Sequence, residues 1–150
     1  MDNLLKFSDD GKTVIGVKQR DVTHIIIPNG VTEIGEGAFR WCSSLQSIDI
    51  PNSVTAIGES AFHGCKSLQS IDIPNSVTAI GKYAFWGCTS LQSIHLHWNQ
   101  LDDIQVYEYS FDGLNTEECI LYVPSGTRWE YRHHPAFSKF KNIEIEKKKP

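Results

Sequence analysis

The sequence has no long apolar run and no surplus of positive charge. No stretch approaches the roughly 20 apolar residues that a membrane-spanning helix needs, so we expect no membrane span. The first residues, MDNLLKFSDDGK, lack a basic segment followed by an apolar one, so we expect no signal peptide in this chain. The formal net charge of −4 argues against nucleic acid as a partner. The single basic run, at residues 147–149, is typical of a solvated tail.

The four cysteines lack the spacing of a metal site. Zinc ligands usually include cysteine pairs about two to four residues apart, and the sequence has none, so we expect no metal and no cofactor. Cys42, Cys65 and Cys88 instead recur every 23 residues, and Cys119 lies outside this spacing. We expect a column of buried thiols. A disulfide between neighbours stays open on distance alone, because stacked strands lie about 5 Å apart.

What the sequence does contain is a 23-residue repeat. Residues 44–66 read SLQSIDIPNSVTAIGESAFHGCK, and residues 67–89 read SLQSIDIPNSVTAIGKYAFWGCT. The two copies differ at four positions: Glu59/Lys82, Ser60/Tyr83, His63/Trp86 and Lys66/Thr89. Self-similarity at this period is the signature of a solenoid, in which each copy buries its apolar side against its neighbours. The sequence therefore predicts one domain of stacked coils.

Each copy begins with a predicted strand of the pattern L-x-x-I-x-I. The alternation at the end of this pattern indicates β structure with one buried face, and equal direction in every copy makes the sheet parallel. The expected strands are residues 22–27, 45–50, 68–73 and 91–96. Proline follows the first three strands, and His97 stands where the fourth proline would be.

The second half of each copy predicts a short extended run and a turn. The extended runs are residues 31–34, 54–57 and 77–80, and a glycine ends each one: Gly35, Gly58 and Gly81. We expect these glycines to have positive φ. An Ala-Phe pair follows in a short helical or 3₁₀ turn, and the phenylalanines are expected to stack at the centre of the coil.

The two ends of the chain depart from the repeat. Residues 1–21 predict a hairpin cap around an Asp-Asp-Gly turn, and residues 22–96 hold the regular repeats. Residues 97–124 form a longer final copy, in which residues 101–104 match the extended run and Ser110-Phe111 match Ala-Phe, before a last strand over residues 120–123. Residues 125–150 predict a C-terminal cap, with a helix over 125–132 and an edge strand over 142–146. Caps at both ends favour a monomer.

Residues 22–96 resemble the BspA-type leucine-rich repeat family, whose repeat of about 23 residues has the core I-P-x-x-V-T-x-I-G-x-x-A-F-x-x-C. The ends, SDDGKT and LYVPSGT, also resemble caps of that family. The resemblance implies a solenoid of a bacterial surface or secreted protein with roles in adhesion and protein–protein interaction, without catalysis. We therefore expect a mainly β, right-handed leucine-rich repeat solenoid with parallel strands, a hairpin N-cap and a helix-plus-strand C-cap.

The outward residues of the long strands form the first candidate site. They stand in columns with one residue per coil, which suits an extended partner. The candidate residues are His24, Gln46, Ser47, Asp49, Gln69, Ser70, Asp72, Gln92, Ser93, His95 and Tyr122. We expect this face to bind another protein, such as a host extracellular-matrix or surface protein.

Asp49, Asp72 and His95 line up in one of these columns. Stacked carboxylates repel, so either a cation lies between them or the column is a solvated polar ladder, which is the interpretation we favour. A catalytic interpretation would take His95 as base and one of three serines, Ser47, Ser70 or Ser93, as nucleophile. No oxyanion hole or strained G-x-S-x-G turn is indicated, so we expect no enzyme.

Aromatic residues on the turn side form the alternative site. Trp41, Tyr83 and Trp86 fall where the copies differ, and exposed aromatic rings can stack on sugars or anchor a protein. Packing on neighbouring coils is the simpler interpretation. A carbohydrate-binding module and a structural spacer of a longer surface protein therefore remain alternatives to protein binding.

Overall fold

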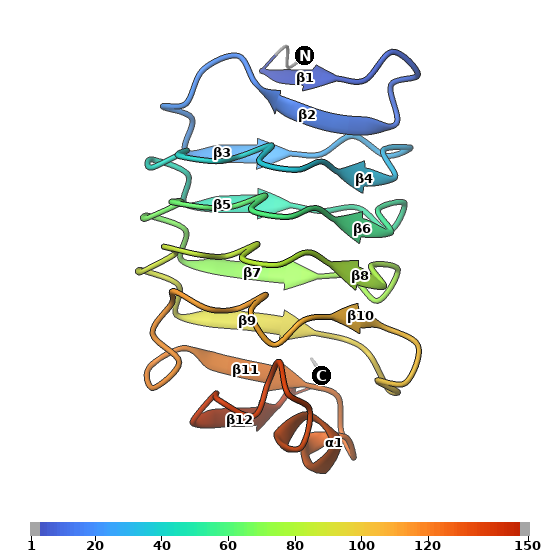
Figure 1. Cartoon of the computed structure of the whole chain (residues 1–150), viewed down its shortest axis with the longest axis vertical. Coiled ribbons are helices and arrows are strands. Elements are labelled where there is room, and N and C mark those ends of the chain that lie inside the picture. Colours follow the sequence, from blue (N-terminus) through green and yellow to red (C-terminus); the bar gives the residue numbers. More distant parts are fainter. Residues whose placement is uncertain (1–3, 148–150) are drawn as a thin grey trace.

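The long strands of successive coils stack in parallel down the molecule (Figure 1). The computed structural model describes residues 4–147, so the expected basic tail lies outside the described residues except for Lys147. The long strands are β3 (His24–Ile26), β5 (Ser47–Asp49), β7 (Ser70–Ile73), β9 (Ser93–Leu96), β11 (Ile120–Val123) and β12 (Asn142–Ile145). β3 pairs with β5, and β7, β9, β11 and β12 pair in that order, all in parallel. The strands β3, β5, β7 and β9 begin two residues later than their sequence patterns, and each is preceded by a buried apolar residue and an exposed polar one.

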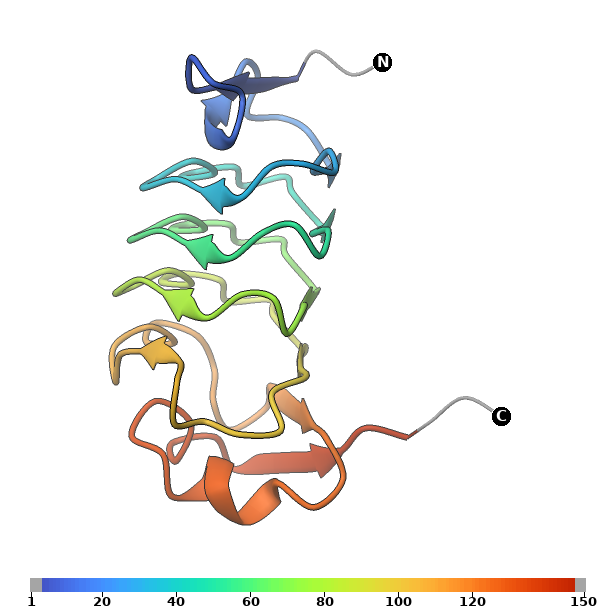
Figure 2. The ribbon, with the colours of Figure 1, turned by 90° about the vertical axis from the view of Figure 1, so that its right-hand side faces the viewer.

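Short strands form a second sheet on another side of the coil, as the side view in Figure 2 shows. They are β4 (Glu33–Ile34), β6 (Ala56–Ile57), β8 (Ala79–Ile80) and β10 (Gln105–Val106). An N-terminal hairpin of β1 (Leu5–Phe7) and β2 (Thr13–Val17) extends this sheet, because β2 pairs in parallel with β4. The expected hairpin cap is therefore confirmed.

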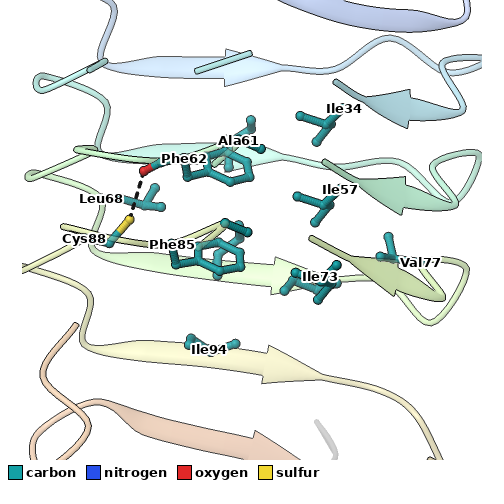
Figure 3. Packing of buried hydrophobic residues seen from close by; sticks show 14 of the residues in the cluster. Ile34, Ile57, Ala61, Phe62, Leu68, Ile73, Val77, Phe85, Cys88 and Ile94 are labelled. Carbon is teal, nitrogen blue, oxygen red and sulfur yellow. Dashed lines mark hydrogen bonds between the residues drawn. The ribbon is translucent and has the colours of Figure 1, made fainter. Parts of the chain in front are cut away.

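Equivalent residues of successive copies stack on one another to make the core (Figure 3). The Phe39, Phe62, Phe85 and Phe111 rings form one column, with centroid separations of 5.4, 5.3 and 5.2 Å. All four side chains are fully buried. The expected phenylalanine column is confirmed, and so is the match of Ser110-Phe111 to Ala-Phe.

The cysteines form a second buried column. All four are free thiols, and the Cys65 and Cys88 thiols donate to the Phe39 and Phe62 carbonyl oxygens at 3.2 and 3.3 Å. Burial raises the pKa of Cys88 and of Cys119 to about 12. The thiols therefore belong to the packing of the stack, as expected, and no disulfide joins them.

The reason for the glycines at the end of the short strands differs from the expectation. Gly35, Gly58 and Gly81 do not have positive φ, so that prediction was wrong. Instead, a Cβ atom on Gly58 would lie 2.7 Å from the Glu36 backbone nitrogen of the preceding coil. Glycine is required here because two backbones approach too closely for any side chain.

The Ala-Phe segments are hydrogen-bonded turns that do not continue into helices. Cys42 N donates to Phe39 O within one such turn, while Phe39 N donates to Ala61 O of the next coil at 2.8 Å. The hydrogen bonds between coils use backbone N–H groups that would otherwise bond within a longer helix. Within residues 4–147 the helix is confined to α1 (Arg128–Arg132).

The final coil corrects the expected alignment. Gln105 and Val106 pair with Ala79 and Ile80, so the match of residues 101–104 to the extended run was wrong by two positions. Trp98 is buried in this coil, and its indole nitrogen donates to Val77 O at 2.7 Å. This bond ties the irregular coil to the coil before it.

The C-terminal cap covers the other end of the core. α1 is shorter than the expected helix, and its N-cap Thr127 makes no side-chain capping bond. Tyr131 from α1 is fully buried, and its hydroxyl donates to Trp98 O at 2.9 Å. β12 then pairs with β11 and contacts α1, so the predicted helix-plus-strand cap is confirmed.

Candidate functional site

The outward residues of the long strands lie in register, and we call this surface the strand face. Ser47 lies beside His24, Asp49 beside Ile26, and His95 between Asp72 and Tyr122. β12 lengthens the columns, because Glu144 lies beside Tyr122. Most of the predicted residues are exposed, while the side chains of three are partly covered: Ser93, His95 and Tyr122. The structure therefore brings the predicted strand-face residues together on one surface.

Histidine–carboxylate pairs cross this surface. His97 Nε2 lies 2.6 Å from Asp72 Oδ1, and His95 Nδ1 lies 2.5 Å from Glu146 Oε1. His24 Nε2 lies 3.5 Å from Asp49 Oδ2. Each member of the Asp49, Asp72 and His95 column thus has a different partner. Among residues 4–147, no three histidine, cysteine or acidic side chains are grouped as a metal site would require.

The strand-face serines form hydrogen bonds with groups other than His95, which the catalytic interpretation had paired with them. Ser47 Oγ lies 2.6 Å from His24 Nδ1, and the Ser70 and Ser93 hydroxyls lie 2.8 Å apart. The His95 ring stacks on Tyr122, with centroids 4.7 Å apart. The His24 and Asp49 side chains remain open to water. These contacts make a polar ladder across the sheet.

Two hollows lie on the strand face. One, of about 510 Å³, is lined by Asp49, Asp72, His97 and neighbouring residues. The other, of about 910 Å³, is lined by residues that include His95, Tyr122, Glu144 and Glu146. Carboxylates therefore edge both hollows.

Sequence reasoning missed His97, Glu144 and Glu146 as parts of this surface. His97 replaces the repeated proline, and that loss of a proline was the available signal. The two glutamates lie outside the 23-residue register, and only the pairing of β12 with β11 brings them to the face.

The aromatic residues of the turn side form a second surface. Trp41, Tyr83 and Trp86 are exposed, as the alternative site requires, although each also contacts a neighbouring coil. Tyr83 meets Trp86 edge-on with centroids 5.8 Å apart and stacks on Tyr109 at 5.9 Å. Trp41 instead contacts His63, edge-on, at 4.9 Å. The structure therefore joins Tyr83 and Trp86 to Tyr109 of the irregular coil and leaves Trp41 at the side.

A hollow of about 490 Å³ opens on this second surface, and we call it the rim hollow. Its lining residues are Ser60, His63, Tyr83, Trp86, Tyr109 and Asp112. The Asp112 carboxylate forms an ion pair with Lys139. The nearby Glu108 carboxylate, through a hydrogen bond and its charge, raises the pKa of the Tyr109 hydroxyl. That hydroxyl therefore stays a neutral donor at physiological pH.

Each coil contributes one long strand to a parallel stack, and its buried residues follow the pattern L-x-x-I-x-I. This arrangement defines a leucine-rich repeat solenoid. The profile described as BspA type Leucine rich repeat region matches residues 17–144 in six copies. The chain belongs to this BspA-type family. No curated protein sequence gives a significant match to the chain.

Solved leucine-rich repeat proteins share the fold. One from Eubacterium ventriosum ATCC 27560 has a TM-score of 0.67 and 21% identity, over 96% of this chain and 38% of its own. The T. pallidum Leucine Rich Repeat protein has a TM-score of 0.57 and 21% identity, over 95% of this chain and 78% of its own. A leucine rich cell surface protein from Faecalibacterium prausnitzii A2-165 has a TM-score of 0.51 and 26% identity, over 96% of this chain and 38% of its own. This chain thus spans well under half the length of two of these relatives. Among residues 4–147, no helix is long and apolar enough to cross a membrane.

Proposed function

We propose that this domain is a non-catalytic module that binds another protein through the strand face. The observation that carries the proposal is the repetition of the same exposed polar side chains at one per coil, with Gln, Ser and Asp at fixed positions of two adjacent strands. Such columns offer a partner hydrogen-bonding groups about every 5 Å along the stack. An extended segment of a partner can therefore bond to several coils at once.

The charge of the strand face supports a partner with a basic surface. Asp49 and Asp72 each expose 67% of their side chains, and Glu144 and Glu146 edge the neighbouring hollow. Complementary charge across an interface speeds encounter and selects partners. A host extracellular-matrix or surface protein with exposed lysine and arginine fits this chemistry.

Family membership supports a surface or secreted location and a role in adhesion. The similar F. prausnitzii protein is described as a cell surface protein. We also propose a monomer, because a hairpin covers one end of the core and α1 with β12 covers the other. The limited share of its relatives' length that this chain spans favours a second candidate, a spacer within a longer protein.

A binding assay with charge-reversed variants tests the proposal. The chain would be passed over immobilised fibronectin, laminin and collagen by surface plasmon resonance, together with an Asp49→Lys/Asp72→Lys variant. We expect saturable binding that weakens at least about tenfold in this variant.

A matched control carries the same change of net charge elsewhere. Glu36→Lys/Glu59→Lys reverses two exposed charges on the turn side, where the next copy already has Lys82. This control should bind like the unaltered chain. Equal weakening in both variants would mean that net charge, and not the strand face, governs binding. No binding to any of the three proteins would favour the spacer.

A further inference from the structure

We propose that the rim hollow binds the ring of a neutral pyranose sugar within an oligosaccharide, as a site separate from the strand face. Three aromatic side chains line it, and each remains exposed by roughly two fifths: Tyr83, Trp86 and Tyr109. Aromatic rings with a free face pack against the C–H face of a sugar ring, and nearby polar groups bond its hydroxyls. The lining of the hollow supplies both kinds of group.

The Trp86 indole is held as a fixed platform. A Cβ atom on Gly113 would lie 2.6 Å from Trp86 Cδ2, so the ring rests on the bare backbone of the next coil. The Tyr83 ring meets the indole edge-on and supports it from a second side. Because one face is covered and 43% of the residue is still exposed, the remaining surface is available to a ligand without prior rearrangement.

The two near-identical copies, residues 44–66 and 67–89, differ at positions that line this hollow. Two of their four differences, Ser60/Tyr83 and His63/Trp86, replace a small and a polar side chain by aromatic ones, and all four of these residues line the hollow. The phenylalanine column beneath them is unchanged in both copies. The phenylalanine column therefore does not require the aromatic pair.

Tyr83 also occupies a backbone conformation that suits glycine better. Its φ is 58°, and the equivalent residue of the first copy, Gly37, has φ 62°. A bulky residue in the left-handed region is uncommon and strained, and such strain gathers at functional sites. Ser60, the equivalent residue of the second copy, has φ 56°, so this conformation belongs to the repeat, and in the third copy a tyrosine occupies it.

The charges around the hollow favour a neutral ligand over a cation. The Asp112 carboxylate is paired with Lys139, and the Lys82 amine lies 5.3 Å from the centre of the neighbouring Tyr107 ring. The Lys139 ammonium therefore neutralises the carboxylate that would otherwise attract a cation to the hollow. The Asp112 oxygens can accept hydrogen bonds from sugar hydroxyls, and so can the Tyr109 oxygen, whose own proton is directed to Glu108.

Titration with neutral hexasaccharides tests the proposal. Cellohexaose, laminarihexaose, mannohexaose and xylohexaose would each be titrated into the chain by isothermal calorimetry. The variants are Tyr83→Ser and Trp86→His, which restore the residues that the preceding copy carries in the same fold. We expect saturable binding of at least one hexasaccharide and a loss of affinity of about tenfold or more in either variant.

Two controls separate this site from others. Trp129→Ala removes an exposed tryptophan on α1, far from the hollow in sequence and not among its lining, and should leave the affinity unchanged. Asp49→Lys/Asp72→Lys should also leave it unchanged, so failure here and failure of the strand face are distinguishable. The absence of binding by all four hexasaccharides, or undiminished binding in Trp86→His with native circular dichroism, would overturn the proposal.

Discussion

The strand face and the turn side are built from the same two copies, yet they differ in how they vary. Between residues 44–66 and 67–89 every strand-face residue is the same, while the turn side holds all four differences. Exposure does not explain this, since the side chains of Asp49 and Asp72 are 67% exposed and Tyr83 is only 38% exposed. On the strand face, Ser70 contacts its own copy Ser93 in the next coil, and Asp72 contacts His97, so a change at either position affects the neighbouring coil. Turn-side residues also contact neighbouring coils, but their partners differ from copy to copy: Trp41 meets His63, and Tyr83 meets Tyr109.

The largest expected effect comes from the core that both surfaces share. Phe62→Ala removes a fully buried ring from the middle of the phenylalanine column. We expect the free energy of unfolding to fall by about 3–5 kcal/mol, because the cavity cannot close between stacked backbones. Urea unfolding followed by circular dichroism measures it. Phe7→Ala, at an exposed position of the hairpin, is the control. If Phe62→Ala lowered the free energy of unfolding no more than Phe7→Ala does, the phenylalanine column would not be a main source of stability.

The buried thiols behind the turn side give a dependence on pH. Burial raises the pKa of Cys88 to about 12 from an ordinary value of 9.0. Above about pH 9 the unfolded chain therefore releases a proton that the folded chain keeps, so the free energy of unfolding should fall as pH rises toward 12. Urea unfolding at about pH 8 and about pH 10.5 measures this fall. Cys88→Ala/Cys119→Ala should show a shallower fall. An equal fall in this variant would assign the effect to other groups.

The polar ladder of the strand face should contribute less. Asp72→Asn removes the carboxylate that lies 2.6 Å from His97 Nε2. Both side chains are more than one third exposed, so we expect the free energy of unfolding to change by about 1 kcal/mol or less. The His97 ring protons in an NMR spectrum should shift, because the pairing is lost. If Asp72→Asn cost as much as Phe62→Ala, the ladder would be part of the folding core.

The smallest effect is expected on the turn side. Glu59→Lys/Lys66→Thr gives the second copy the exposed residues of the third. Since both sets already occur on the same backbone, the free energy of unfolding should stay within about 0.5 kcal/mol. Thermal unfolding checks this. A clear destabilisation would mean that the copies differ because each is fitted to its own neighbours.

Much of the fold could be predicted because the fixed 23-residue period shows which residues of successive copies are equivalent. The strand columns and the phenylalanine column followed from spacing and alternation, and the caps followed from turn and helix-start signals outside the repeat. The role of Gly58 could not, because the close approach involves Glu36 of another coil. The alignment of the final coil failed for a similar reason, since Trp98 bonds to Val77 of the preceding coil and to Tyr131 of α1, both distant in the sequence.

The candidate site was predictable in composition and not in its contacts. The columns of glutamine, serine and aspartate were visible in the repeat. The partners of His95 and Asp72 were not, since Glu146 lies 51 residues from His95 and His97 lies 25 from Asp72. The joining of Tyr83 and Trp86 to Tyr109 likewise depends on how the irregular coil stacks.

The sequence by itself determined the solenoid, its family and which residues face outward, because a fixed period and strand alternation leave one way to bury the apolar positions. Only the tertiary structure decided which outward residues meet. Contacts across coils depend on the exact path of turns and caps, and that path is set by packing between segments distant in the chain.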